Sequence, residues 1–181
     1  RLFLMFRAFG FNNCRVLNGA WDKWSAESRP TTTGVPDYSD ATFTPNPQPG
    51  QIIGKDEVLA AVQRKDTCLI NALSPEIFSG ATVNASYGRP GHIAGSVNLY
   101  AYDLINKTDN TFADAAALRE KFQAVGVLDQ KNIITYCGGG ISATTDSFAL
   151  MLLGRDDVAL YDGSMTEWGP DESLPMSTLV N

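Results

Sequence analysis

Cys137 is the residue in this sequence best placed for covalent chemistry. It follows the apolar run 132–136 and precedes a helical pattern over 143–153. The loop between them consists of Gly138, Gly139, Gly140, Ile141 and Ser142. Glycine backbone can turn amide N–H groups inward, and a helix start favours negative charge. A thiol there is expected to ionise easily, while the amides hold an anionic sulfur species. The competing interpretation is a buried structural cysteine that ends a core strand.

The other cysteines and the single histidine restrict the chemistry further. Cys14 and Cys68 each open a short apolar run and are interpreted as structural thiols. Three widely spaced cysteines predict neither a disulfide framework nor a zinc knuckle, and a single histidine excludes a multi-histidine metal centre. His92 is either a turn residue bonded to nearby backbone or the base of a Cys–His pair. We expect no metal and no cofactor.

Composition limits the partners of the protein. The 181 residues carry a net charge of −6, so the clustered cations that nucleic acid requires are not indicated. No apolar stretch reaches the ~20 residues of a membrane span. Free thiols favour a reducing compartment, and we expect a cytoplasmic protein. A periplasmic or exported location stays open, because the chain begins at Arg1 rather than at methionine, which suggests a fragment or a processed product.

Helical and strand patterns alternate from residue 56 onward. Helices are expected at 56–64, 75–78, 101–105, 114–125 and 143–153, and strands at 68–72, 96–99, 132–136 and 158–161. Residues 42–44 are a candidate for a further edge strand. Strands that are apolar throughout and alternate with helices predict an α/β fold with a mainly parallel sheet of about five strands, covered by helices on both faces. Ligands of such sheets bind at the carboxyl ends of strands, where Cys137 lies.

The first 50 residues differ from the rest of the chain. Residues 29–50 are rich in proline and are predicted to be an extended linker. Residues 2–24 align without a gap with residues 146–168, and this alignment pairs Gly10 with Gly154 and Trp24 with Trp168. We therefore interpret 1–28 as the C-terminal remnant of a second domain of the same fold. Its missing front is expected to be supplied by a separate chain or to have been lost by cleavage.

Three segments, 88–98, 136–143 and 160–168, jointly resemble the C-terminal half of the two-domain rhodanese sulfurtransferases. The resemblance implies a catalytic rhodanese-like domain over 51–181 and an inactive N-terminal rhodanese domain as the origin of 1–28. It also implies a ping-pong mechanism. Cys137 would take sulfane sulfur from thiosulfate or 3-mercaptopyruvate, become a persulfide, and pass the sulfur to cyanide or a thiol. Arg89 is expected either to steer the anionic donor or to brace a turn.

Two other functions stay open. The domain is alternatively a non-catalytic persulfide carrier in a sulfur relay. A Cys-dependent phosphatase or arsenate reductase is disfavoured, because the six-residue loop contains no arginine.

The sulfur donor also stays open. The loop is similar to that of mercaptopyruvate-using relatives, with Ser142 as the closing hydroxyl residue. However, Asn71-Ala72-Leu73 stands where the family usually has Asp-Ala-Arg, and Ile77 stands where a second arginine would bind the carboxylate of the donor. Asp162 and Ser164 resemble residues at the rim of the family's site.

Overall fold

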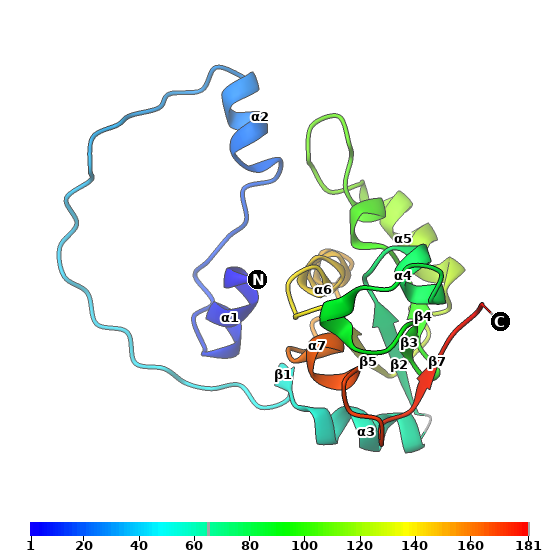
Figure 1. Cartoon of the computed structure of the whole chain (residues 1–181). Coiled ribbons are helices and arrows are strands. Elements are labelled where there is room, and N and C mark those ends of the chain that lie inside the picture. The colour runs from blue at the N-terminus through cyan, green and yellow to red at the C-terminus, as the bar shows by residue number, and fades with distance from the viewer. Residues whose placement is uncertain (65, 181) are drawn as a thin grey trace.

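A parallel sheet forms the centre of the protein (Figure 1). The computed structural model describes residues 1–64 and 66–180. The five strands have the order β1-β6-β5-β2-β4. Their bounds are Ile52–Ile53 (β1), Thr67–Asn71 (β2), Val97–Asn98 (β4), Asn132–Tyr136 (β5) and Val158–Tyr161 (β6). A separate antiparallel ribbon pairs His92–Ile93 (β3) with Met176–Ser177 (β7). The predicted α/β fold with a parallel sheet is confirmed.

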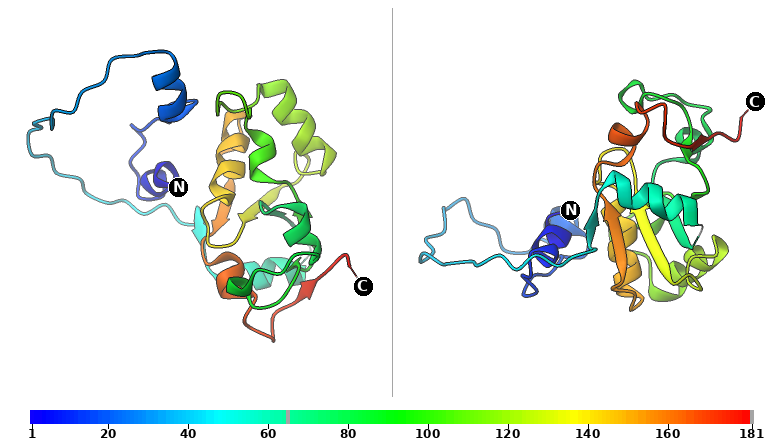
Figure 2. Two further views of the ribbon diagram at one scale, coloured as in Figure 1. Left: turned by 45° about the horizontal axis from the view of Figure 1, so that its top comes forward. Right: turned by 90° about the horizontal axis from the view of Figure 1, so that it is seen from below.

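Helices cover both faces of the sheet (Figure 2). The helices are Leu2–Ala8 (α1), Ala20–Ala26 (α2), Lys55–Arg64 (α3), Pro75–Ser79 (α4), Ala115–Ala124 (α5), Ala143–Leu152 (α6) and Ser164–Trp168 (α7). Two short 3-10 helices are Ala85–Tyr87 (η1) and Ala101–Leu104 (η2). One core cluster joins α3 and α7 to the sheet, and the other joins α5 and α6 to its opposite face. Within the described residues, no helix is both long enough and apolar enough to cross a bilayer.

The central strand β5 explains this layering. Successive residues of a strand point to opposite faces, and both Ile133 and Ile134 are buried. Ile133 belongs to the cluster beneath α5 and α6, whereas Ile134 belongs to the cluster beneath α3 and α7. A strand that is apolar on both faces can lie only between two layers of helices. The apolar residues of β5 therefore place this strand, and Cys137 after it, in the middle of the domain.

Specific residues define the ends of α5 and α6. Asp114 caps α5, because its Oδ1 accepts a hydrogen bond from the amide of Ala117 at 2.9 Å. Gly126 and Gly154 follow α5 and α6 with φ of 69° and 87°. This left-handed backbone ends a helix at little cost when the residue is glycine.

The candidate edge strand at 42–44 is wrong, because these residues form no strand. One edge of the sheet is instead occupied by β1, which pairs with β6 and places Ile52 opposite Leu160. The apolar run that Cys14 opens is likewise in no strand. The expected linker over 29–50 has no helix or strand and runs as a wide loop that rejoins the domain at β1 (Figure 1).

Candidate active site

The fold brings Cys137 to the carboxyl end of the central strand. β5 ends at Tyr136, and α6 begins six residues after Cys137, at Ala143. The neighbours of β5 in the sheet are β2 and β6, one from each side. A ligand at this end of a parallel sheet lies among the loops that follow the strands. The Cys137 side chain is only 2 % exposed, so a reactant must be small enough to enter the loop.

Ser164 braces the loop formed by residues 137–142, hereafter the cysteine loop. Its Oγ accepts hydrogen bonds from the amides of Cys137 (3.0 Å) and Gly140 (3.1 Å), and donates to the carbonyl of Tyr161 (2.8 Å). Ser164 has a φ of 51°, which is unusual for a residue with a side chain. These three hydrogen bonds hold it in that conformation. Ser164 therefore connects the cysteine loop to the turn between β6 and α7.

The remaining loop amides are available to an anion. Within residues 1–64 and 66–180, no acceptor is recorded for the amides of Gly138, Gly139, Ile141 and Ser142. Consecutive amides of this kind form a concave donor surface for negatively charged groups. Of the loop amides, those of Cys137 and Gly140 bind the Ser164 hydroxyl instead.

Two glycines of the cysteine loop are enclosed by neighbouring groups. A Cβ at Gly138 would lie 2.2 Å from the hydroxyl of Tyr87. Gly140 has a φ of 68°, and a Cβ there would lie 2.6 Å from the carbonyl oxygen of Asp162 and 2.6 Å from its Oδ1. All three distances are far below van der Waals contact. These positions therefore require glycine because other parts of the chain approach the loop backbone.

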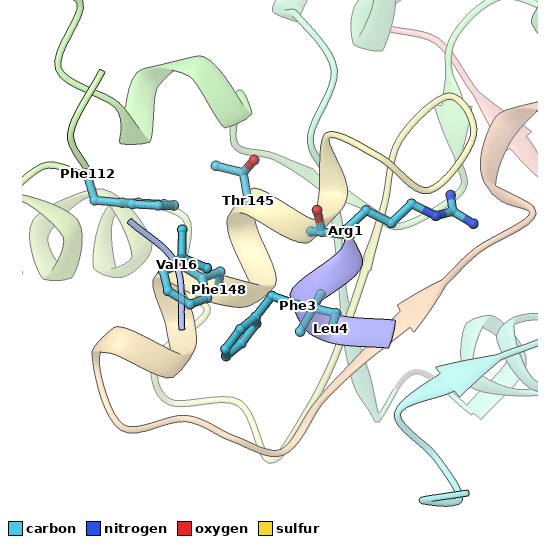
Figure 3. A pocket seen from close by; sticks show the side chains of 8 residues that line it. Arg1, Phe3, Leu4, Val16, Phe112, Thr145 and Phe148 are labelled. Carbon is cyan, nitrogen blue, oxygen red and sulfur yellow. The ribbon is translucent and has the colours of Figure 1, made fainter. Parts of the chain in front are cut away.

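The N-terminal segment supplies a cation to the edge of the cysteine loop. The guanidinium of Arg1 donates to the carbonyl of Gly139 (2.9 Å) and forms an ion pair with Asp162 (2.6 Å). Arg1 stands at the start of α1, beside α6, and its side chain extends away from the aromatic residues Phe3 and Phe148 (Figure 3). The loop itself contains no cation, as its sequence shows. The folded site nevertheless has one, already paired with a carboxylate.

A buried carboxyl group lies in the first turn of α6. Asp146 has no solvent-exposed surface, and neither of its oxygens has a hydrogen-bond partner among the described residues. Burial, together with the negative charge of Cys137, raises the pKa of Asp146 well above its usual range. The negative form of Asp146 is therefore disfavoured close to the cysteine loop.

This burial predicts a pH-dependent effect of Asp146→Asn. Because its folded-state pKa is raised above the unfolded value of about 3.9, Asp146 contributes stability below that pH and loses the contribution as pH rises through the folded-state pKa. Asparagine does not titrate. We expect the free energy of unfolding of the variant, measured in urea, to equal that of wild type near pH 4 and to be about 1–3 kcal/mol higher near pH 8. Parallel pH profiles of the two proteins would contradict this.

An exposed carboxylate provides the control for that experiment. Asp103 lies in η2 and is exposed. Asp103→Asn removes one negative charge without altering a buried group, and we expect a stability change within about 0.5 kcal/mol at each pH.

Arg89 braces a turn in the structure. All three guanidinium nitrogens donate to backbone carbonyls, which belong to Trp168, Gly169, Asp171 and Leu174. Of the two roles expected for Arg89, these contacts favour turn bracing over steering of an anionic donor. The guanidinium fastens η1 to the segment that follows α7.

His92 is also engaged in structure. Its ring is buried in β3, stacks on Phe78 at 3.7 Å between ring centroids, and places Nδ1 2.7 Å from the Phe78 carbonyl. Burial lowers the pKa of His92. The turn-fixing role of His92 is the one that these contacts support.

Three residues near the cysteine loop were not predicted from the sequence to belong to the site. They are Arg1, Tyr87 and Asp146. Arg1 meets the loop across 138 residues of sequence, and Tyr87 comes from a separate 3-10 helix, so no local pattern connects them to Cys137. Asp146 did carry a signal, because it interrupts the apolar face of the helix that follows the loop.

The chain belongs to the family of Rhodanese-like domains, whose model matches residues 55–171. It is 33% identical over 179 residues to a putative thiosulfate sulfurtransferase 1 of Mycobacterium bovis, which covers 94% of this chain and 64% of the relative. It is 32% identical to the sulfur carrier protein TtuD of Thermus thermophilus, with 97% and 65% covered. Rat 3-mercaptopyruvate sulfurtransferase is 28% identical, with 93% and 57% covered. The protein is thus related to rhodanese-family sulfurtransferases, and it spans about three fifths of their length.

A solved structure shares the fold. The anaerobic ergothioneine biosynthesis enzyme from Chlorobium limicola, in complex with trimethyl histidine, superposes with a TM-score of 0.88 at 25% identity. The match covers 100% of this chain and 45% of that enzyme.

Proposed function

We propose that this protein is a sulfurtransferase that carries sulfane sulfur as a persulfide on Cys137. The observation that carries the proposal is the cysteine loop itself: a nearly buried thiol at the end of the central strand, with four loop amides available as donors. Among the described residues no arginine guanidinium lies free beside this loop, since Arg1 is paired with Asp162. The arrangement suits a single negatively charged sulfur better than a phosphate, and it favours sulfur transfer over phosphatase chemistry.

The proposed reaction has two displacement steps. First, the Cys137 thiolate attacks the outer sulfur of thiosulfate. Its bond to the sulfite group breaks, sulfite leaves with the electron pair, and a persulfide remains on Cys137. Second, the carbon of cyanide attacks the outer sulfur of the persulfide. The sulfur–sulfur bond breaks, thiocyanate leaves, and Cys137 returns to the thiolate. The loop amides stabilise the negative charge on sulfur in both steps.

The donor is the part of the function to be tested first. Purified protein is incubated with thiosulfate or with 3-mercaptopyruvate, and its intact mass and thiocyanate production are measured. We expect the mass of one added sulfur atom, located on the peptide that contains Cys137, and turnover with cyanide. Absence of added sulfur with both donors would reject the proposal.

A persulfide carrier is the second candidate. It is supported by the relation to a protein named a sulfur carrier and by the nearly complete burial of Cys137. The same experiment separates the two functions. A carrier gives the added sulfur but negligible thiocyanate.

We infer that residues 1–28 are the end of a preceding rhodanese domain. Three structural observations support this. The internal alignment pairs Ala20 with Ser164, and both have left-handed φ, at 50° and 51°. It pairs Gly10 with Gly154, whose φ values are 86° and 87°. It also places α1 opposite α6. Unusual backbone conformations that recur at the same spacing are characteristic of a repeated unit.

The surface of this N-terminal segment supports the same inference. Leu4 and Ala8 of this segment are buried, but several other apolar side chains are exposed to solvent; the most exposed are Leu2, Leu17 and Trp21, at 62, 56 and 63 %. Side chains of this kind normally pack against a domain core. The greater length of the relatives fits a missing front that would cover them.

Isolation of the protein from its natural source tests the domain organisation. We expect either a longer chain by intact mass or a second rhodanese chain that copurifies. A protein that begins at Arg1 and remains folded and monomeric by itself would contradict the inference.

A further inference from the structure

Tyr87 points its phenol toward the cysteine loop from outside it. The hydroxyl lies where a side chain at Gly138 would otherwise be, 2.2 Å from that ideal Cβ position. Gly138 is the residue directly after Cys137. The ring of Tyr87 packs against the core cluster beneath α7, so only its polar end reaches the loop. A hydrogen-bond donor therefore stands beside the residue that follows the nucleophile.

The backbone of Tyr87 is held firmly. Its amide donates to the carbonyl of Asn84, and its carbonyl accepts from the amide of Arg89, both at 2.9 Å. The Arg89 guanidinium fastens the same segment to the carbonyl of Trp168, the last residue of α7, and to three carbonyls after it. Gly169 packs so closely that a Cβ there would overlap the Tyr87 carbonyl oxygen. These contacts fix the backbone from which the phenol projects, and a donor on a rigid backbone loses less entropy when it binds a ligand.

The hydroxyl of Tyr87 is not used by the fold. In the part of the chain that the structure describes, no hydrogen bond to this hydroxyl is present, whereas the hydroxyls of Tyr136 and Tyr161 are both bonded. Burial and the negative charge of Cys137 raise the pKa of Tyr87, so the phenol keeps its proton at neutral pH. A protonated hydroxyl without a protein acceptor is free to donate to a negatively charged atom in the site.

We propose that the Tyr87 hydroxyl donates a hydrogen bond to the outer sulfur of the Cys137 persulfide. The proposal rests on the proposed persulfide function. The phenol keeps its proton throughout. Its hydrogen bond stabilises the charged outer sulfur that forms when the bond within the sulfur donor breaks. This hydrogen bond is lost when the acceptor removes the outer sulfur. The inference rests on the position of the Tyr87 hydroxyl, which lies beside Gly138 of the cysteine loop and has no hydrogen-bond partner among the described residues.

The test compares Tyr87→Phe with wild type by two measurements. The first is thiocyanate turnover. The second is the pH midpoint for alkylation of the loaded outer sulfur by iodoacetamide, followed by intact mass. A lost hydrogen bond to a charged group lowers turnover about tenfold. It also moves the alkylation midpoint upward by about one pH unit, because the charged sulfur loses a donor.

The controls keep the outcomes distinct. Tyr87→Phe removes a hydroxyl that bonds no described residue, so its thermal unfolding is expected to match wild type. Tyr38, 82 % exposed in the segment 29–50, provides the matched change Tyr38→Phe, for which we expect turnover and midpoint to be unchanged. If wild type forms the persulfide and Tyr87→Phe keeps both turnover and midpoint, the role of Tyr87 is rejected and the function stands. If wild type forms no persulfide, both proposals fail.

Discussion

Replacing Cys137 with serine is expected to abolish sulfur transfer, with a loss of about a thousandfold or more in thiocyanate formation. Serine preserves the size of the side chain, but its hydroxyl is not ionised at neutral pH and forms no stable bond to sulfane sulfur. The loop amides and the Ser164 brace do not depend on the thiol, since the brace uses the amides of Cys137 and Gly140. The variant should therefore fold normally, and unfolding measurements check this.

The other thiols provide the control for that experiment. Cys68 is the second residue of β2 and pairs with Ile133 near the amino end of β5, whereas the cysteine loop follows the carboxyl end of β5; burial raises the pKa of the Cys68 thiol. The Cys14 thiol lies 3.4 Å from the carbonyl of Phe11. We expect Cys68→Ser and Cys14→Ser to keep wild-type turnover. Added sulfur on either of these residues, or turnover by Cys137→Ser, would show that the nucleophile has been misassigned.

Gly140→Ala is expected to destabilise the folded protein by about 2 kcal/mol or more and to prevent persulfide formation. A side chain is disfavoured at a φ of 68°, and the added carbon would lie 2.6 Å from two oxygens of Asp162. Asp162 cannot withdraw easily, because Tyr161 before it is bonded to Ser164 and its own carboxylate is paired with Arg1. The loop must therefore shift, and its amides move away from the sulfur.

Gly139→Ala is the matched control for the stability measurement. Gly139 stands one residue earlier in the same loop, where a Cβ would meet only the Thr166 hydroxyl at 3.9 Å, an ordinary contact. We expect its free energy of unfolding to stay within about 0.5 kcal/mol of wild type. Equal destabilisation by the two substitutions would mean that the loop rejects any side chain, whatever the backbone conformation.

The long elements of the fold could be predicted from the sequence because each has a regular pattern. β5 is apolar on both faces, and α5 has both a capping aspartate and a terminal glycine. The two-residue strands β1, β3 and β7 have no such pattern, since two residues cannot show a period. β1 forms only because β6 offers it an edge. The sequence of residues 42–44 likewise does not reveal whether a sheet edge is available to them.

The candidate site likewise has a part that the sequence predicts and a part that it does not. The cysteine loop is contiguous in sequence, so its glycines, thiol and following helix could be recognised together. Arg1 and Tyr87 reach the loop only after distant segments pack, and nothing near either residue indicates it. The role of Arg89 was ambiguous for a related reason. A guanidinium binds carbonyls and anions with the same donors, and only the packed turn after α7 shows which it meets.

The extended segment 29–50 has a thermodynamic consequence for the contact between Arg1 and the cysteine loop. One ion pair and one hydrogen bond at a partly exposed surface contribute little by themselves. The packing of α1 on α6, where the rings of Phe3 and Phe148 lie 5.0 Å apart, adds to them. A flexible tether keeps its two ends at an effective concentration of about millimolar, which favours such a contact within one chain. The cation beside Gly139 is therefore maintained both by the packing of α1 and by its covalent connection through the wide loop.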